Sequence, residues 1–238
     1  MFTRTESFRE FIRFYPVVSM IAAIHVVLYL FTILPVFPNY WFFENLSGVN
    51  LYIMEGEFWR LITPIFMHSG FSHMLFNSFS LILFGPPLER LLGGGRFLLV
   101  YLVSGFIANA ATLLLEPLTY THVGSSGAIF GLFGFYLAMI LFRKHLLSKQ
   151  NSQIILTLCA ISLIMTFLEP NINITAHIFG LLGGFLLGAV PYYKKMDLTS
   201  TVKGVSSWAK GRKPLPPVKI FIWGFIILAA IIGMIARF

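Results

Sequence analysis

Ser126 and His177 are the two residues whose types suit the hydrolysis of an amide bond. A serine hydroxyl is a weak nucleophile at neutral pH and becomes effective when a base lies within hydrogen-bond reach; histidine is the residue most often used as that base. Ser126 stands in the stretch 121–131, THVGSSGAIFG, and His177 in the stretch 176–184, AHIFGLLGG. The two stretches are far apart in the chain, so the fold has to bring them together.

Acyl transfer also needs hydrogen-bond donors for the oxyanion that forms on the attacked carbonyl. If a helix begins at Ser126, its backbone N–H is unpaired and the helix dipole favours an anion there. His73 and Asn77, in the stretch HMLFN, are four residues apart and therefore share one face of a helix. In the company of Ser126 and His177, we interpret this pair as oxyanion donors. The alternative is a pair that hydrogen-bonds one helix to another.

The other polar residues favour a Ser/His dyad over a triad. The single aspartate, Asp197, falls on the opposite side of the membrane in the topology derived below, and Glu116 and Glu169 lie near outer ends of spans but off the shared helix faces. His122 is an alternative base, but it precedes the helix. Ser125 is interpreted as a turn residue.

Rival hydrolytic chemistries lack their residues. A zinc protease motif HExxH requires a histidine followed by glutamate, and no histidine in this sequence is followed by one. An aspartyl intramembrane protease needs two aspartates within the membrane. His68 and His73 are not joined by a third ligand at a sensible spacing for zinc. We therefore expect no metal.

The composition identifies the elements that must position these residues. Of 238 residues, 57% are hydrophobic and 11% are charged, with a mean hydropathy of +0.83, whereas soluble domains carry about 25% charged residues. Seven stretches are long and apolar enough for a helical span of ~20 residues. They are continuous runs without two-residue alternation, which favours helices over a barrel. The stretches lie near residues 16–34, 71–89, 97–115, 126–142, 152–168, 174–193 and 218–236.

The predicted fold class is therefore all-α, a polytopic transmembrane helix bundle. Cytoplasmic loops of membrane proteins carry an excess of Lys and Arg. With the N-terminus in the cytoplasm and the C-terminus outside, 15 of the 17 basic residues are cytoplasmic, and Arg60 and Arg237 remain outside. This bias also accounts for the net charge of +8 without a nucleic-acid partner.

Two regions outside the spans differ in character. Residues 35–70 form an aromatic-rich outer loop, which we expect to lie in the headgroup layer; anchoring and substrate gating are equally good readings of it. Residues 194–217 are basic and contain Ser, Gly and Pro, as in a cytoplasmic linker next to anionic lipid. We expect a membrane core over 1–193, this linker, and an additional C-terminal transmembrane helix over 218–238.

Glycines at four-residue intervals follow both Ser126 and His177. Small residues at this spacing let transmembrane helices approach backbone to backbone. We expect the two helices to touch along these glycines, which would put Ser126 beside His177; the alternative is that the glycines serve packing alone. The glycines concerned are Gly127 and Gly131 in one helix and Gly180 and Gly184 in the other.

Four separated motifs, in order, resemble the rhomboid family of intramembrane serine proteases over roughly residues 16–193. They are EFWRLITPIFMHSGFSHMLFN (57–77), PLERLLGGGR (87–96), GSSGAIFG (124–131) and AHIFGLLGG (176–184). The resemblance implies a six-helix core, and the seventh span resembles the longer forms with one appended helix. It places the nucleophile on Ser126, the general base on His177, the HxxxN pair on His73 and Asn77, and the loop WR motif on Trp59 and Arg60.

The resemblance further implies a serine endopeptidase that acts in the cell membrane. Its substrates would be single-span or multi-span membrane proteins, cut near the outer end of a transmembrane helix after entering from lipid past the fifth span and the loop 35–70. No cofactor is implied. The alternative function is a non-catalytic membrane protein that binds substrate helices in quality control or trafficking. A transporter is a more distant alternative, since no span is broken near its middle around a carboxylate.

Overall fold

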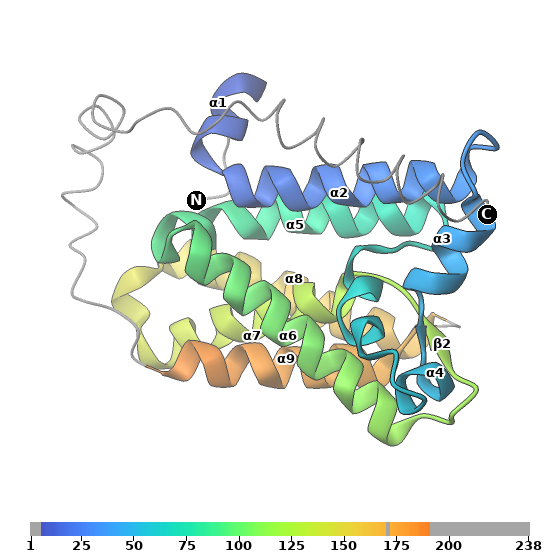
Figure 1. Ribbon diagram of the computed structural model, residues 1–238. Coiled ribbons are helices and arrows are strands. Elements are labelled where there is room, and N and C mark those ends of the chain that lie inside the picture. The colour runs from blue at the N-terminus through green and yellow to red at the C-terminus, as the bar shows by residue number, and fades with distance from the viewer. Residues whose placement is uncertain (1–5, 170–171, 191–238) are drawn as a thin grey trace.

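The computed structural model describes residues 6–169 and 172–190 of the chain. The predicted linker over 194–217 and the predicted seventh span over 218–236 lie outside the described residues, as does the C-terminal end. Six long helices coincide with the first six of the seven predicted apolar stretches (Figure 1). They are α2 (Pro16–Ile33), α5 (Phe71–Leu92), α6 (Gly94–Leu115), α7 (Ser126–Phe142), α8 (Lys149–Leu168) and α9 (Ile174–Ala189).

Within the described residues, three helices are long and apolar enough to cross a membrane by length and composition: α2, α6 and α8. The helices α7 and α9 are apolar but shorter. A helical membrane bundle is therefore confirmed, while the count of six spans plus one stays a prediction. The short helices α1 (Phe8–Phe14) and η3 (Lys144–Leu146) flank α2 and α8.

The helix α7 lies at the centre of the bundle. Every residue from Gly127 to Tyr136 is buried, as expected for a helix that is apolar on all sides and surrounded by others. It packs against α6 and α9, and its aromatic residues join a core shared with α2 and α5. Only its first residue, Ser126, is partly exposed in this stretch. The central helix thus offers one polar side chain at its outer end.

A buried carboxylate ties α5 to α2 at the opposite end of the bundle. Glu89 accepts hydrogen bonds from the backbone N–H groups of Val17 (2.9 Å) and Val18 (2.8 Å). These amides are in the first turn of α2, where N–H groups lack partners within the helix and the dipole favours an anion. Glu89 therefore serves as the N-terminal cap that α2, which begins at Pro16, does not have of its own.

The loop between α2 and α5 is a folded unit at one end of the molecule (right in Figure 1). Arg60 lies at its centre with 2% of its surface exposed. It donates to the carboxylate of Glu57 and to the backbone carbonyls of Glu44 (2.6 Å) and Ser47 (2.7 Å). The elements of the loop are α3 (Asn39–Leu46), β1 (Gly48–Val49), α4 (Asn50–Met54) and the 3-10 helices η1 (Phe58–Leu61) and η2 (Thr63–Phe66).

This outer loop holds the segment that leads into α7. The strand β1 pairs antiparallel with β2 (Thr121–His122), opposing Gly48 to His122. Gly124 donates its N–H to the carbonyl of Pro64 (2.9 Å). The residues immediately before Ser126 are therefore fixed by two separate contacts with the loop.

Candidate active site

The two serines of GSSG have different environments. Ser126 is the first residue of α7 and is partly exposed, whereas the Ser125 side chain is completely buried. Of the two serines, Ser126 is therefore the one with surface outside the protein interior. The backbone N–H of Ser126 belongs to the first turn of α7, where donors have no partner within the helix.

Gly124 brings this turn close to His73. Its φ of +128° is one that residues with a side chain rarely adopt. A Cβ placed on Gly124 would lie 2.7 Å from Nε2 of His73 and 3.8 Å from Oγ of Ser126. Nε2 of His73 and Oγ of Ser126 therefore both lie close to Gly124, and a side chain on Gly124 would occupy the space beside them.

His73 and Asn77 lie at the start of α5 and are oriented differently. Nδ1 of His73 is 3.1 Å from the hydroxyl of Ser69, and its Nε2 faces the turn at Gly124. Asn77 donates one amide proton to the backbone carbonyl of His73 (3.0 Å), within its own helix. The structure brings His73 next to Ser126; among the described residues, the hydrogen-bond partner of Asn77 is His73.

The helix α9 carries His177 in its first turn and is held there by the outer end of α6. Asn173 caps α9, and its amide donates to the hydroxyl of Thr112 (2.9 Å). Thr175 donates to the carboxylate of Glu116 (2.6 Å). Glu116 thus supports the start of the helix.

Glycine lets α7 and α9 touch backbone to backbone. A Cβ on Gly180 would collide with the carbonyl oxygen of Gly127, and one on Gly184 with the carbonyl oxygen of Gly131. On α7 in turn, a Cβ on Gly134 would collide with the carbonyl oxygen of Leu181. The contact follows the four-residue spacing read from the sequence, and it places the first turns of the two helices side by side.

The imidazole of His177 contacts an aromatic ring with one face and a hydroxyl with one ring nitrogen. Its ring stacks on that of Phe130, one helical turn after Ser126, with centroids 4.2 Å apart and planes 18° apart. Its Nδ1 lies 2.8 Å from Oγ1 of Thr166, on α8. Within residues 6–169 and 172–190, no hydrogen bond joins Ser126 to His177. Such bonds are often long in a free enzyme and shorten when substrate binds.

Thr166 is the site residue that sequence reasoning missed. A third group was expected to be a carboxylate, whereas the group next to Nδ1 of His177 is a neutral hydroxyl. The available signal was a small polar residue in the outer part of an otherwise apolar helix, since polar groups at membrane depth need a partner.

Trp59 and Arg60 make their contacts within the outer loop. The indole N–H of Trp59 donates to the carbonyl of Asn45 (3.1 Å), and Arg60 forms the loop interactions described above. The guanidinium also lies over the ring of Tyr52, 5.0 Å from its centroid. Both residues therefore stabilise the fold of the outer loop.

His122, the alternative base, faces the loop as well. Its ring packs against Gly48 and stacks on Tyr120, with centroids 6.2 Å apart. Burial lowers the pKa of His122 to about 4, so the imidazole is neutral at pH 7. Within the described residues, no hydrogen bond joins His122 to Ser126.

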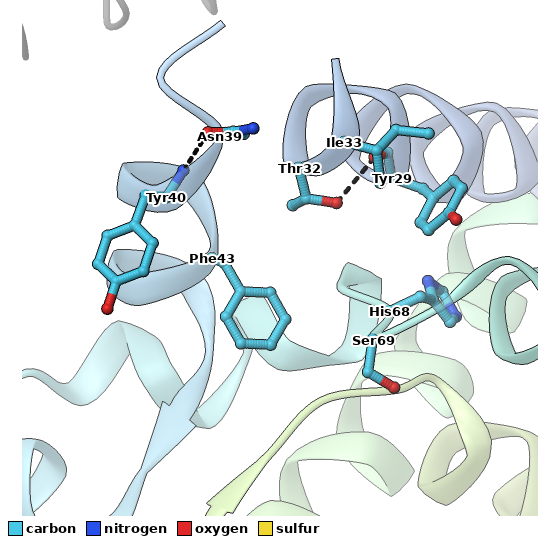
Figure 2. A pocket seen from close by; sticks show the side chains of 8 residues that line it. All are labelled: Tyr29, Thr32, Ile33, Asn39, Tyr40, Phe43, His68 and Ser69. Atoms are coloured by element: carbon cyan, nitrogen blue, oxygen red, sulfur yellow. Dashed lines mark hydrogen bonds between the residues drawn. The ribbon is translucent and has the colours of Figure 1, made fainter. Parts of the chain in front are cut away.

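A cavity of about 280 Å³ opens between the outer ends of α2 and α3 and the segment before α5 (Figure 2). Thr32 and Phe43 project into this space from the two helices, and Ser69, the partner of His73, lines its far side. His68 borders the cavity and stands between His25 and His73, with ring centroids 4.7 and 5.2 Å away.

The described part of the chain contains no group of three or more His, Cys, Asp or Glu residues arranged to hold a metal ion.

The fold and the site together define a class: a helical membrane protein in which glycine-packed helices present a serine and a histidine at the same end of the bundle. The Rhomboid domain model matches residues 55–194, more than half of the chain. The chain belongs to the rhomboid family.

Individual relatives agree with this family. YdcA of Bacillus subtilis (strain 168), whose name assigns it provisionally to the rhomboid proteases, is 54% identical over 195 residues, covering 82% of this chain and 98% of that protein. Rhomboid protease GluP of the same organism is 39% identical over 59% of this chain and 27% of its own length. RHOMBOID-like protein 1 of Arabidopsis thaliana is 30% identical over 79% of this chain and 49% of its own length.

Proposed function

We propose that this protein is an intramembrane serine endopeptidase that cleaves transmembrane helices near the outer membrane face, with Ser126 as nucleophile and His177 as general base. The observation that carries the proposal is the shared location of the two residues. An accessible serine begins α7, and the histidine of α9 stacks on Phe130 one turn further along the same helix.

The reaction follows from these positions. Nε2 of His177 accepts the hydroxyl proton of Ser126 as Oγ bonds to the scissile carbonyl carbon. The protonated imidazole then gives this proton to the departing amine nitrogen as the C–N bond breaks. A water molecule, activated by the same nitrogen, releases the acyl group and restores the serine.

We assign three donors to the oxyanion. The backbone N–H of Ser126 is one, and it lies at the positive end of the α7 dipole. His73 is the second: when the hydroxyl of Ser69 donates to its Nδ1, the ring proton stands on Nε2, which faces the turn. Asn77 keeps a second amide proton after its bond to the carbonyl of His73 and is the third.

The length of α7 supports cleavage below the outer surface. Its 17 residues span about 25 Å, which is less than the ~30 Å of a bilayer core. With its C-terminal end at the cytoplasmic face, Ser126 lies several ångströms inside the outer boundary. The substrates are therefore membrane proteins that reach the site from lipid, beside α8 and the outer loop. In this orientation the N-terminus of the enzyme lies in the cytoplasm and its C-terminus outside.

The test is cleavage of a panel of tagged single-span proteins by the full chain in lipid vesicles. We expect Ser126→Ala and His177→Ala to abolish cleavage, while Ser125→Ala, the matched control next to the nucleophile, retains it. A fluorophosphonate should label the native chain and not Ser126→Ala. Cleavage that persists in both variants rules out the dyad. Binding of the panel without cleavage or labelling identifies the alternative, a non-catalytic protein that binds helices.

A further inference from the structure

We infer that Thr166 is a positioning residue that holds the imidazole of His177 in the tautomer with its proton on Nδ1, leaving Nε2 free to take the proton of Ser126. The catalytic part of this role rests on the proposed function. The hydrogen-bond arrangement on which it depends is independent of that proposal.

The number of protons around Thr166 determines the tautomer. Its hydroxyl is 2.9 Å from the backbone carbonyl oxygen of Ser162, one turn earlier in α8, and 2.8 Å from Nδ1 of His177. A carbonyl oxygen accepts only, and a hydroxyl has a single proton to donate. This proton goes to Ser162, so the bond to His177 has Nδ1–H as its donor. In a neutral imidazole, the other nitrogen then carries the lone pair.

Burial makes this arrangement persistent. Thr166 is 1% exposed, so water does not compete for its oxygen. Phe130 covers one face of the ring, and the bond to Thr166 fixes the rotation of the ring within that plane. The imidazole can therefore turn over only by losing a buried hydrogen bond.

A hydroxyl is well suited to this place. In soluble serine proteases a buried aspartate holds the corresponding nitrogen and its tautomer. A carboxylate at membrane depth carries a large desolvation cost, whereas a threonine oxygen accepts the same N–H without a buried charge. Thr166 thus gives orientation without the charge of a triad.

The bond also links the base to the position of α8. Three side chains of this helix are buried: Ile155, Cys159 and Thr166. Ile155 lies in the half that follows η3, Cys159 lies at the middle of the helix, and Thr166 is the one near its outer end. Any outward displacement of that end separates Oγ1 from Nδ1, so the tautomer of His177 depends on where α8 stands.

The first experiment measures the tautomer directly by nitrogen NMR of the full chain labelled with ¹⁵N-histidine. Signals of His177 are identified by their loss in His177→Asn. We expect a protonated Nδ1 and an unprotonated Nε2 in the native chain and in Thr166→Ser. In Thr166→Val, which keeps the shape and removes the hydroxyl, we expect a shift toward protonated Nε2. An unchanged tautomer in Thr166→Val overturns the inference, whether or not the protein cleaves any substrate.

The second experiment measures kcat and KM for a cleaved substrate. We expect Thr166→Val to lower kcat about 10- to 100-fold with little change in KM, as losses of groups that orient a site residue do, and Thr166→Ser to restore most of the rate. Thr157→Val, the same change at an exposed position of α8, is the control. Equal impairment in Thr166→Ser and Thr166→Val would assign Thr166 to packing. If the native chain cleaves no substrate, the proposed function is refuted, and the NMR result still decides the tautomer.

Discussion

The contact between α7 and α9 differs in kind from the contact between α8 and the rest of the bundle. The first is made by backbones that meet at glycines, with α7 buried on all sides. The second has few buried side chains, and Thr166 is the polar one. Ser126 and His177 are placed by the rigid contact, whereas the orientation of the His177 ring depends on the weaker one. The position of the base therefore depends on the contact of α7 with α9, and the hydrogen bond that fixes its ring comes from α8.

The largest effect is expected from an added methyl group in the rigid contact. In Gly184→Ala the Cβ meets the backbone carbonyl of Gly131, which cannot rotate away. We expect a loss of stability of about 3 kcal/mol or more and loss of cleavage, measured by thermal unfolding in detergent and by the vesicle assay. Gly95→Ala is the control, because a Cβ there meets nothing within 4 Å. Equal behaviour of the two variants would show that close backbone approach is not what joins the helices.

The second prediction compares a Phe→Ala substitution in α7 with one in α8. Phe135, on α7, is completely buried, and Phe167, on α8, is 59% exposed. We expect Phe135→Ala to cost about 3 kcal/mol, because the cavity it leaves cannot be filled, and Phe167→Ala to change stability by less than about 0.5 kcal/mol. Thermal unfolding of both variants in the same detergent is the measurement. A large loss in Phe167→Ala would mean that α8 is held more firmly than its burial indicates.

The sequence predicted the rigid region well because its signals are periodic. Continuous apolar runs gave the helices, and α7 begins at Ser126, where the run begins. Boundaries differ where local rules compete: α5 continues through Pro86 and Pro87 to Leu92, beyond the predicted end at 89. The buried neighbours of those prolines maintain the helix in spite of their missing N–H groups.

Sequence reasoning was weaker where contacts depend on single hydrogen bonds. The strands β1 and β2 have two residues each, too few for any alternation to be read. The aromatic loop was expected in the headgroup layer, and the centre of its fold is the buried Arg60, whose partners are mostly backbone carbonyls without a side-chain signature. Thr166 belongs to the same class, since its hydrogen bond to His177 joins two helices, and no periodic pattern in the sequence pairs these two residues.

The smallest expected effect is a loss of stability at low pH caused by His122, in the segment that leads into α7. Burial lowers the pKa of His122 to about 4 from its ordinary value of about 6.5. Between these values the unfolded chain binds a proton that the folded chain does not, so stability falls as pH decreases from 6.5 to 4 and levels off below 4. The contribution of this residue is about 1–3 kcal/mol.

The measurement is the midpoint of thermal unfolding at pH 7, 5.5 and 4 for the native chain and for His122→Phe. We expect the variant to lose part of the acid sensitivity in this window, because a phenyl ring in the same site has no proton to gain. His145→Phe, at an exposed position of η3, is the control and should follow the native chain. If His122→Phe remains as acid-sensitive as the native chain, the acid-labile group lies elsewhere, and the turn before Ser126 owes its stability to the pairing of β1 with β2 and not to a neutral imidazole.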